Sequence, residues 1–105
     1  MINLLKRLLG LGPKVDLKPI IEKGATIIDV RTLQEFKAGH IKGSKNIALQ
    51  QLDQQAIAKI KKMPQPIITC CASGMRSERA RGILANAGME VYNGGGWKSL
   101  EQKMR

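Results

Sequence analysis

Apolar and polar residues form alternating blocks along the chain, and the period of the pattern switches between that of strands and that of helices. Short runs, most of them apolar, predict strands at residues 26–30, 44–47, 67–70 and 91–93. Between these runs, apolar residues recur at the spacing of one helical face, and Gly or Pro follows them. We therefore expect helices at residues 17–23, from 33 onward, and at 49–60, 77–87 and 97–104.

This alternation of strands and helices is typical of α/β proteins, in which helices cover a parallel sheet. The expected fold is a small parallel β-sheet of about four or five strands with helices on both faces. A chain of 105 residues with 43% hydrophobic content can bury one core, and we place a single domain at residues 14–105. Ligands of such sheets bind beyond the carboxyl ends of the strands.

Residues 1–13 form a separate short amphipathic segment, in which apolar residues surround two basic ones before glycines and a proline interrupt the pattern. A transmembrane helix needs about 20 apolar residues, and a secretory signal needs an uninterrupted apolar stretch with a small-residue cleavage site. Neither pattern is present, which predicts a cytoplasmic protein. Because a helix of this length is marginal in water, we expect residues 1–11 to pack on the domain or fray, in preference to contacting a membrane surface.

The segment after the third predicted strand places Cys71 shortly before a helix start. At a helix N-terminus several backbone N–H groups lack intrahelical partners, and with the aligned peptide dipoles they favour negative charge. A cysteine with a pKa of about 8.5 is only about 3% ionised at pH 7, and such a site lowers the pKa. Gly74 permits an inward turn, Arg76 adds a cation, and Ser77 is the expected N-cap. The sequence therefore predicts a thiolate at Cys71 in an anion-binding loop.

The composition of the chain argues against several classes of partner and cofactor for this loop. The net charge is +10, but the lysines are scattered and aromatic residues make up only 3%, so we expect no nucleic-acid binding. The basic field should instead concentrate small anions. Two adjacent cysteines and one histidine give neither a disulfide framework nor a zinc-site spacing, so we expect no metal, no cofactor and two reduced thiols. Cys70 is expected in the core, because adjacent strand residues point to opposite faces.

The cysteine loop is the most specific motif of the chain, and it reads Cys71, Ala72, Ser73, Gly74, Met75, Arg76, Ser77. It resembles the active loop of the rhodanese family of sulfurtransferases, Cys-x-x-Gly-x-Arg-Ser, in which a cysteine carries sulfane sulfur as a persulfide. Further matches follow in the expected order at residues 27–31, 35–36, 39–41, 43–44 and 94–97. The resemblance covers roughly residues 16–100. It implies a rhodanese-like fold, a persulfide on Cys71, and donor binding by the six residues that follow it.

Three charged residues of the other motifs have a structural explanation beside a functional one. The resemblance implies that Asp29 and Arg31 belong to a charge network that supports the active face. Glu35 is explained locally by a capping box at residues 32–35, and pairing with Arg31 would be its link to catalysis.

Three further features are expected to be structural. His40, in a Gly-His-Ile turn, is expected to be a hydrogen-bonded structural residue and not a general base. The glycines at residues 94–96 lack the spacing of a nucleotide-binding fingerprint and are expected to form a flexible wall. The ring of Trp97 is expected to be buried in the core.

We expect a sulfurtransferase that moves sulfane sulfur from thiosulfate or a persulfide to a thiophilic acceptor, such as cyanide, a small thiol or a protein thiol. We also expect a monomer. Ala72 stands where some family members carry a cation, which argues against strong thiosulfate selectivity. A sulfur-carrier or regulatory binding module with little turnover stays open as an alternative. A cysteine phosphatase or arsenate reductase is less favoured: Cys70 and Arg76 have the required spacing, but the glycine three residues after the nucleophile favours Cys71.

Overall fold

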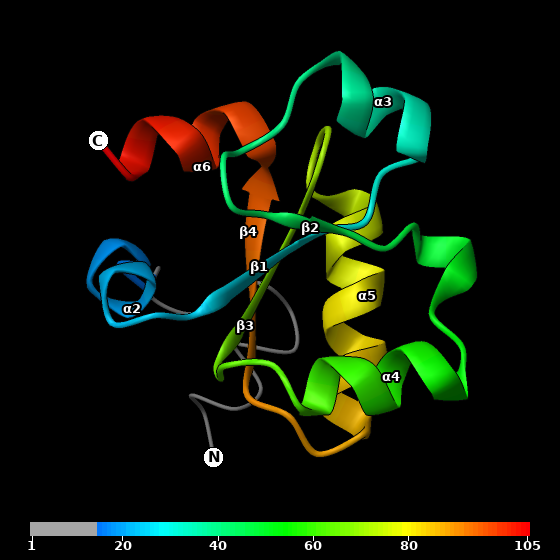
Figure 1. Ribbon diagram of the computed structural model, residues 1–105. Coiled ribbons are helices and arrows are strands. Elements are labelled where there is room, and N and C mark those ends of the chain that lie inside the picture. Colours follow the sequence, from blue (N-terminus) through cyan, green and yellow to red (C-terminus); the bar gives the residue numbers. More distant parts are fainter. Residues whose placement is uncertain (1–14) are drawn as a thin grey trace.

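The computed structural model describes residues 15–105. In this part of the chain strands and helices alternate, and the elements are α2 (Lys18–Glu22), β1 (Thr26–Asp29), α3 (Leu33–Ala38), β2 (Lys45–Asn46), the 3-10 helix η1 (Leu49–Gln51), α4 (Gln54–Lys61), β3 (Ile67–Cys71), α5 (Met75–Asn86), β4 (Val91–Gly96) and α6 (Trp97–Lys103) (Figure 1). None of these helices has the length and apolar character needed to cross a membrane. The amphipathic segment expected at residues 1–13 lies outside the described residues.

The strands form one parallel sheet in the order β2-β1-β3-β4. The central strands β1 and β3 are buried along their whole length, which explains why their sequences are apolar runs without alternation. In the register of this pair, Asp29 at the end of β1 lies opposite Cys70. The expected α/β fold with a small parallel sheet is confirmed.

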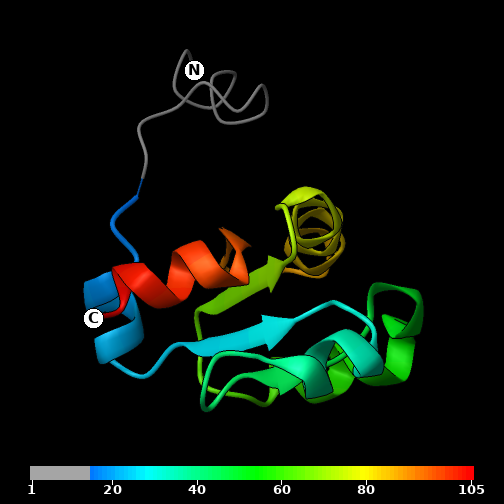
Figure 2. The ribbon, with the colours of Figure 1, turned by 90° about the horizontal axis from the view of Figure 1, so that it is seen from above.

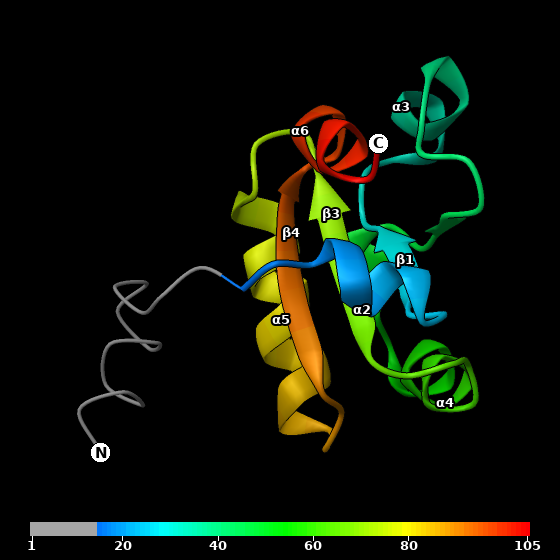
Figure 3. The ribbon, with the colours of Figure 1, turned by 90° about the vertical axis from the view of Figure 1, so that its left-hand side faces the viewer.

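Helices cover both faces of the sheet, and each face has its own core (Figures 2 and 3). On one face, α4 and α5 contribute Ile60 and Leu84, which pack with Ile28, Ile67 and Cys71. On the other face, α2 and α6 cover a second core that contains Leu17, Ile27, Ile68, Cys70 and Leu100. The pleat of β3 therefore sends the two neighbouring cysteines to opposite sides of the sheet.

The predicted helix at residues 49–60 is wrong in one respect, because the chain forms two helices there. The 3-10 helix η1 ends after Gln51, and α4 begins at Gln54. The Asp53 side chain accepts a hydrogen bond from the Ala56 N–H at 2.9 Å and is the N-cap of α4. A good N-cap residue in the middle of an apolar periodic segment starts a new helix.

The start of α5 and the length of β4 also differ from the sequence-based prediction. Helix α5 begins at Met75 with Gly74 as its N-cap in the left-handed region (φ 101°), so Ser77 lies inside the first turn and is not the cap. A glycine reaches this backbone conformation without steric cost. Strand β4 continues through the glycines to Gly96 instead of ending at residue 93.

Candidate active site

Cys71 is the last residue of β3 and lies at the carboxyl edge of the sheet, where the chain turns into α5. The strand before it is held by parallel pairing on both sides, so the position of the thiol is fixed by the rigid centre of the fold. Residues 72–74 make the turn, and α3 lies beyond the same edge (Figure 1). This edge is where ligands of parallel α/β sheets bind.

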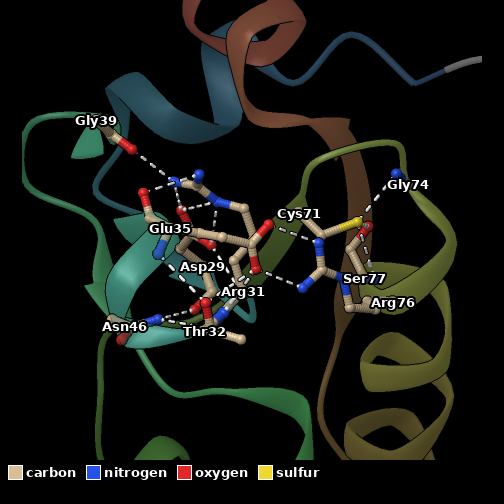
Figure 4. Close-up of polar contacts among 10 residues, drawn as sticks. All are labelled: Asp29, Arg31, Thr32, Glu35, Gly39, Asn46, Cys71, Gly74, Arg76 and Ser77. Carbon is tan, nitrogen blue, oxygen red and sulfur yellow. Dashed lines mark hydrogen bonds and ion pairs between the residues drawn. The ribbon is translucent and has the colours of Figure 1, made fainter. Parts of the chain in front are cut away.

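The Cys71 Sγ atom accepts hydrogen bonds from the first turn of α5 (Figure 4). The Gly74 N–H lies 2.9 Å from the sulfur, the Ser77 N–H lies 3.4 Å from it, and the Ser77 hydroxyl lies 3.3 Å from it. Burial raises the pKa of the Cys71 thiol, but the contacts with the Ser77 side chain and with the N–H groups of Ser77, Gly74 and Ser73 outweigh it and hold the pKa below its ordinary value. The loop thus stabilises a thiolate.

Asn93 is a member of the site that the sequence analysis missed. Its Oδ1 atom accepts hydrogen bonds from the Ser77 hydroxyl at 2.7 Å and from the Gly95 N–H at 2.9 Å. Its Nδ2 atom donates to the Gly74 carbonyl at 3.1 Å and lies 3.4 Å from Glu78 Oε1. Asn93 therefore joins β4 to the loop and to the first turn of α5. The available signal was a lone amide side chain just before a glycine run at the end of a strand.

The glycines of β4 allow the strand to pass close to the loop, which corrects the expectation of a flexible wall. A Cβ atom on Gly96 would lie 2.8 Å from the carbonyl oxygen of Ala72, the residue after the thiol. A Cβ atom on Gly94 would lie 2.8 Å from the side chain of Leu100 and 3.0 Å from the carbonyl oxygen of Thr69. The two distances of 2.8 Å are shorter than real Cβ atoms show, so the strand is closely packed at Gly94 and Gly96.

Arg76 forms a bidentate ion pair with Glu35 of α3, with N–O distances of 2.7 and 3.0 Å. Glu35 is also the partner of Thr32 in the capping box at the start of α3, which is confirmed. The hydrogen bonds from Arg76, followed by that from the Thr32 backbone, lower the pKa of Glu35 to about 2. The expected pairing of the Glu35 carboxylate with Arg31 is wrong. The Arg76 guanidinium, expected to face a bound anion, is engaged by Glu35 and ties α5 to α3.

Asp29 and Arg31 form a buried, multiply hydrogen-bonded ion pair directly beneath this edge. The Arg31 guanidinium donates to Asp29 Oδ2 at 2.7 Å, to the Gly39 carbonyl at 2.7 Å and to the Glu35 carbonyl at 3.2 Å. Its carbon Cζ lies 4.8 Å from the centre of the Trp97 ring. The pair thus connects the end of β1 to both ends of α3 and to the start of α6.

The remaining residues from the sequence analysis lie around the site without contacting the sulfur. His40 Nδ1 lies 2.8 Å from the Phe36 carbonyl oxygen and its ring stacks on Phe36, as expected for a structural residue. Trp97 packs against the core of the α6 face. Cys70 is buried in that core, and burial, followed by the charge of Asp29, raises the pKa of its thiol to about 12. Within residues 15–105, no three His, Cys, Asp or Glu side chains gather as a metal site would require.

Known proteins resemble this chain in sequence and in fold. The rhodanese-like domain model matches residues 14–103. The chain belongs to the rhodanese family. Relatives of the chain include the uncharacterised Bacillus subtilis protein YqhL, which is 39% identical over 83 residues, and the thiosulfate sulfurtransferase GlpE of Pseudoalteromonas translucida, which is 35% identical over 82 residues.

These similarities cover different shares of the two relatives. The alignment covers 77% of this chain and 64% of YqhL, so the chain spans less than two thirds of that relative, whereas it covers 76% of this chain and 76% of GlpE. Among solved structures, a rhodanese with anions from Escherichia coli is 27% identical, with a TM-score of 0.64 over 72% of this chain and 91% of that one. The rhodanese fold and family are shared over nearly all of the described residues.

Proposed function

We propose that the protein is a sulfurtransferase that uses Cys71 as its nucleophile. The observation that supports this most directly is the Cys71 sulfur at the strand end, held by the N–H groups of Gly74 and Ser77 at 2.9 and 3.4 Å. A thiolate is the reactive form of cysteine, and these donors stabilise it before any substrate arrives. Family membership and the thiosulfate sulfurtransferase relatives favour sulfur transfer among the reactions open to such a thiolate.

The reaction proceeds in two displacements. The Cys71 thiolate attacks the outer sulfur of thiosulfate or of a persulfide, the sulfur–sulfur bond of the donor breaks, and sulfite or a thiolate leaves with the bonding electron pair. A thiophilic acceptor then attacks the outer sulfur of the Cys71 persulfide, and Cys71 departs as a thiolate. The N–H donors of the loop stabilise the Cys71 thiolate before the first step and the charge that returns to this sulfur as it leaves in the second step, as preorganised donors do where charge develops.

Two features of the loop bear on the choice of donor and acceptor. Ala72 follows the nucleophile, and the Arg76 guanidinium is paired with Glu35, so neither side chain offers an unpaired cation to thiosulfate. This favours persulfide donors, which need less charge compensation. Met75, at the start of α5, is 78% exposed although it is apolar, and it favours an acceptor with an apolar contact surface, such as a protein thiol.

The second candidate is a sulfur carrier with little turnover, and the same pairing of Arg76 with Glu35 favours it, because a leaving sulfite then has no free guanidinium. A phosphatase or arsenate reductase that uses Cys70 is disfavoured. Cys70 is buried on the face of the sheet opposite Cys71, among the side chains of the α2 and α6 core, and an elevated pKa keeps it protonated at neutral pH.

The test is an assay of thiocyanate formation from thiosulfate and cyanide, with intact mass measured after donor treatment. For an enzyme, we expect turnover and one added sulfur atom in the wild type, loss of both in Cys71→Ser, and retention of both in Cys70→Ser. Added sulfur on Cys71 with negligible turnover would favour the carrier. Retention of sulfur loading in Cys71→Ser would contradict both readings, and phosphate release from an aryl phosphate would favour the phosphatase.

A further inference from the structure

The hydrogen bonds of Asn93 fix which way its side-chain amide points. The Gly95 backbone N–H, which can only donate, lies 2.9 Å from Oδ1. The Gly74 carbonyl oxygen, which can only accept, lies 3.1 Å from Nδ2. Neither partner can exchange its role, so the atom that faces Ser77 is the amide oxygen.

This orientation determines where the Ser77 hydroxyl proton lies. Asn93 Oδ1 has no proton to donate, and it lies 2.7 Å from Ser77 Oγ, so the hydroxyl must be the donor in that hydrogen bond. A hydroxyl has a single proton. Across the 3.3 Å contact with Cys71, Ser77 Oγ is then left to accept from the thiol S–H. The three groups form a chain in which each proton points away from the sulfur.

When Cys71 loses its thiol proton, the hydrogen-bonding role of the Ser77 hydroxyl changes. The thiolate of Cys71 is an acceptor only, and it can then compete with the amide oxygen of Asn93 for the one hydroxyl proton of Ser77. Ser77 and Cys71 are fully buried and Asn93 is partly buried, so water does not replace the Ser77 hydroxyl as a donor to the sulfur. A stronger hydrogen bond from the Ser77 hydroxyl to Asn93 Oδ1 therefore makes ionisation of Cys71 less favourable.

We propose that Asn93 is a positioning residue that competes with Cys71 for the hydroxyl proton of Ser77 and thereby sets the ionised fraction of the nucleophile. This inference deepens the proposed function, since it takes Cys71 as the nucleophile. Asn93 touches no reacting atom and acts only through Ser77. The N–H groups of Gly74 and Ser77 supply the constant part of the stabilisation, and the hydroxyl supplies the adjustable part.

The charged groups around the loop are the same in the wild type, Asn93→Ala, Ser77→Ala and the double variant. They are Arg76 and Glu78 of α5, Glu35 of α3, and the Asp29–Arg31 pair at the end of β1. Their influence on the Cys71 thiol cancels when variants are compared in a double-mutant cycle, provided that the fold is retained.

The experiment measures the Cys71 pKa from the pH dependence of its alkylation by iodoacetamide in the wild type, Asn93→Ala, Ser77→Ala and the double variant. Intact mass identifies the adduct, and Cys71→Ser is the blank. We expect Asn93→Ala to lower the Cys71 pKa by about one unit, which is about tenfold more thiolate at a pH well below the pKa. In the Ser77→Ala background the same substitution should leave the pKa unchanged.

The direction of the shift separates this role from a structural one. If Asn93 only braced the loop, its loss would loosen the N–H donors around the sulfur, and the Cys71 pKa would rise. A rise, no change, or an equal shift with and without Ser77 would each overturn the proposal. Should Asn93→Ala fail to fold, Asn93→Asp provides the cycle: its stronger acceptor should raise the pKa more when Ser77 is present than in Ser77→Ala, and equal shifts would refute the proposal.

Alkylation depends on thiol acidity and not on sulfur transfer. A failure of this cycle and a failure of the thiocyanate assay therefore identify different errors. The first concerns the Ser77 proton, and the second concerns the reaction.

Discussion

Replacing Gly96 by Ala tests how closely β4 constrains the active loop. The added Cβ atom would lie 2.8 Å from the Ala72 carbonyl oxygen, while ordinary contact begins at 3.4 Å, so one of the two backbones must move by about 0.6 Å. A backbone oxygen cannot rotate away as a flexible side chain can. We expect this overpacking to cost about 1–3 kcal/mol of unfolding free energy, and each kcal/mol lowers the melting temperature by roughly 4–8 °C in a domain of this size.

The same displacement should impair the nucleophile, because Ala72 is covalently next to Cys71. The displacement should lengthen the hydrogen bonds from the N–H groups to the Cys71 sulfur and raise its pKa. A rise of about one unit leaves about tenfold less thiolate, so we expect Gly96→Ala to reduce the alkylation rate of Cys71 at pH 7 by about tenfold. The matched control is Gly82→Ala in α5, where a Cβ atom meets nothing within 4 Å. That variant should keep its reactivity and gain about 0.5–1 kcal/mol, since alanine favours a helix over glycine.

Thermal unfolding and alkylation of these two variants and the wild type test whether β4 constrains the loop. A Gly96→Ala protein that melts and reacts like the wild type would show that the loop and β4 are not in close contact. A loss of equal size in Gly82→Ala would show that the effect has nothing to do with the loop.

Three further outcomes follow from the ion pairs and the thiol. Asp29→Asn should cost about 3–5 kcal/mol in urea unfolding, because it leaves Arg31 charged and buried without its partner. The Glu35 pKa is about 2 when folded and 4.5 ordinarily, so its pairing with Arg76 stabilises the fold fully above about pH 4.5 and is lost as the pH falls toward 2. Since that pair is about a third exposed, we expect only about 1 kcal/mol, measured as the difference between wild type and Glu35→Gln in unfolding at pH 6 and at pH 2. The alkylation rate of Cys71 should reach half its maximum below the ordinary thiol pKa, and a midpoint at or above that value would contradict the stabilising loop.

The elements that the sequence predicted well are those whose signals are local. The buried strands β1 and β3 are short apolar runs, and the capping box of α3 lies within four consecutive residues. Two helix starts were predicted wrongly because the apolar pattern was given more weight than the residue that caps the helix. Asp53 starts α4 inside a continuous apolar pattern, and Gly74 starts α5 because it alone in the loop has the left-handed backbone needed there.

The parts of the candidate site that could not be predicted depend on contacts distant in sequence. Glu35 and Arg76 are separated by 41 positions, and nothing local to either residue indicates the ion pair between them. Asn93 is 16 positions from Ser77, and its role depends on the parallel pairing that brings β4 beside β3. Cys71 was predictable because the donors around its sulfur come from Gly74 and Ser77, only a few residues away.

The dependence of the thiol on β4 has a consequence for the protein during its synthesis. Oxidants attack thiolates faster than thiols, so an acidic cysteine is also a vulnerable one. Gly96, whose backbone packs closely on Ala72 of the loop, is made after Cys71 and lies in the last strand of the sheet. A growing chain therefore exposes an ordinary, mostly protonated thiol to peroxide, and the sensitive form arises only when the sheet is complete.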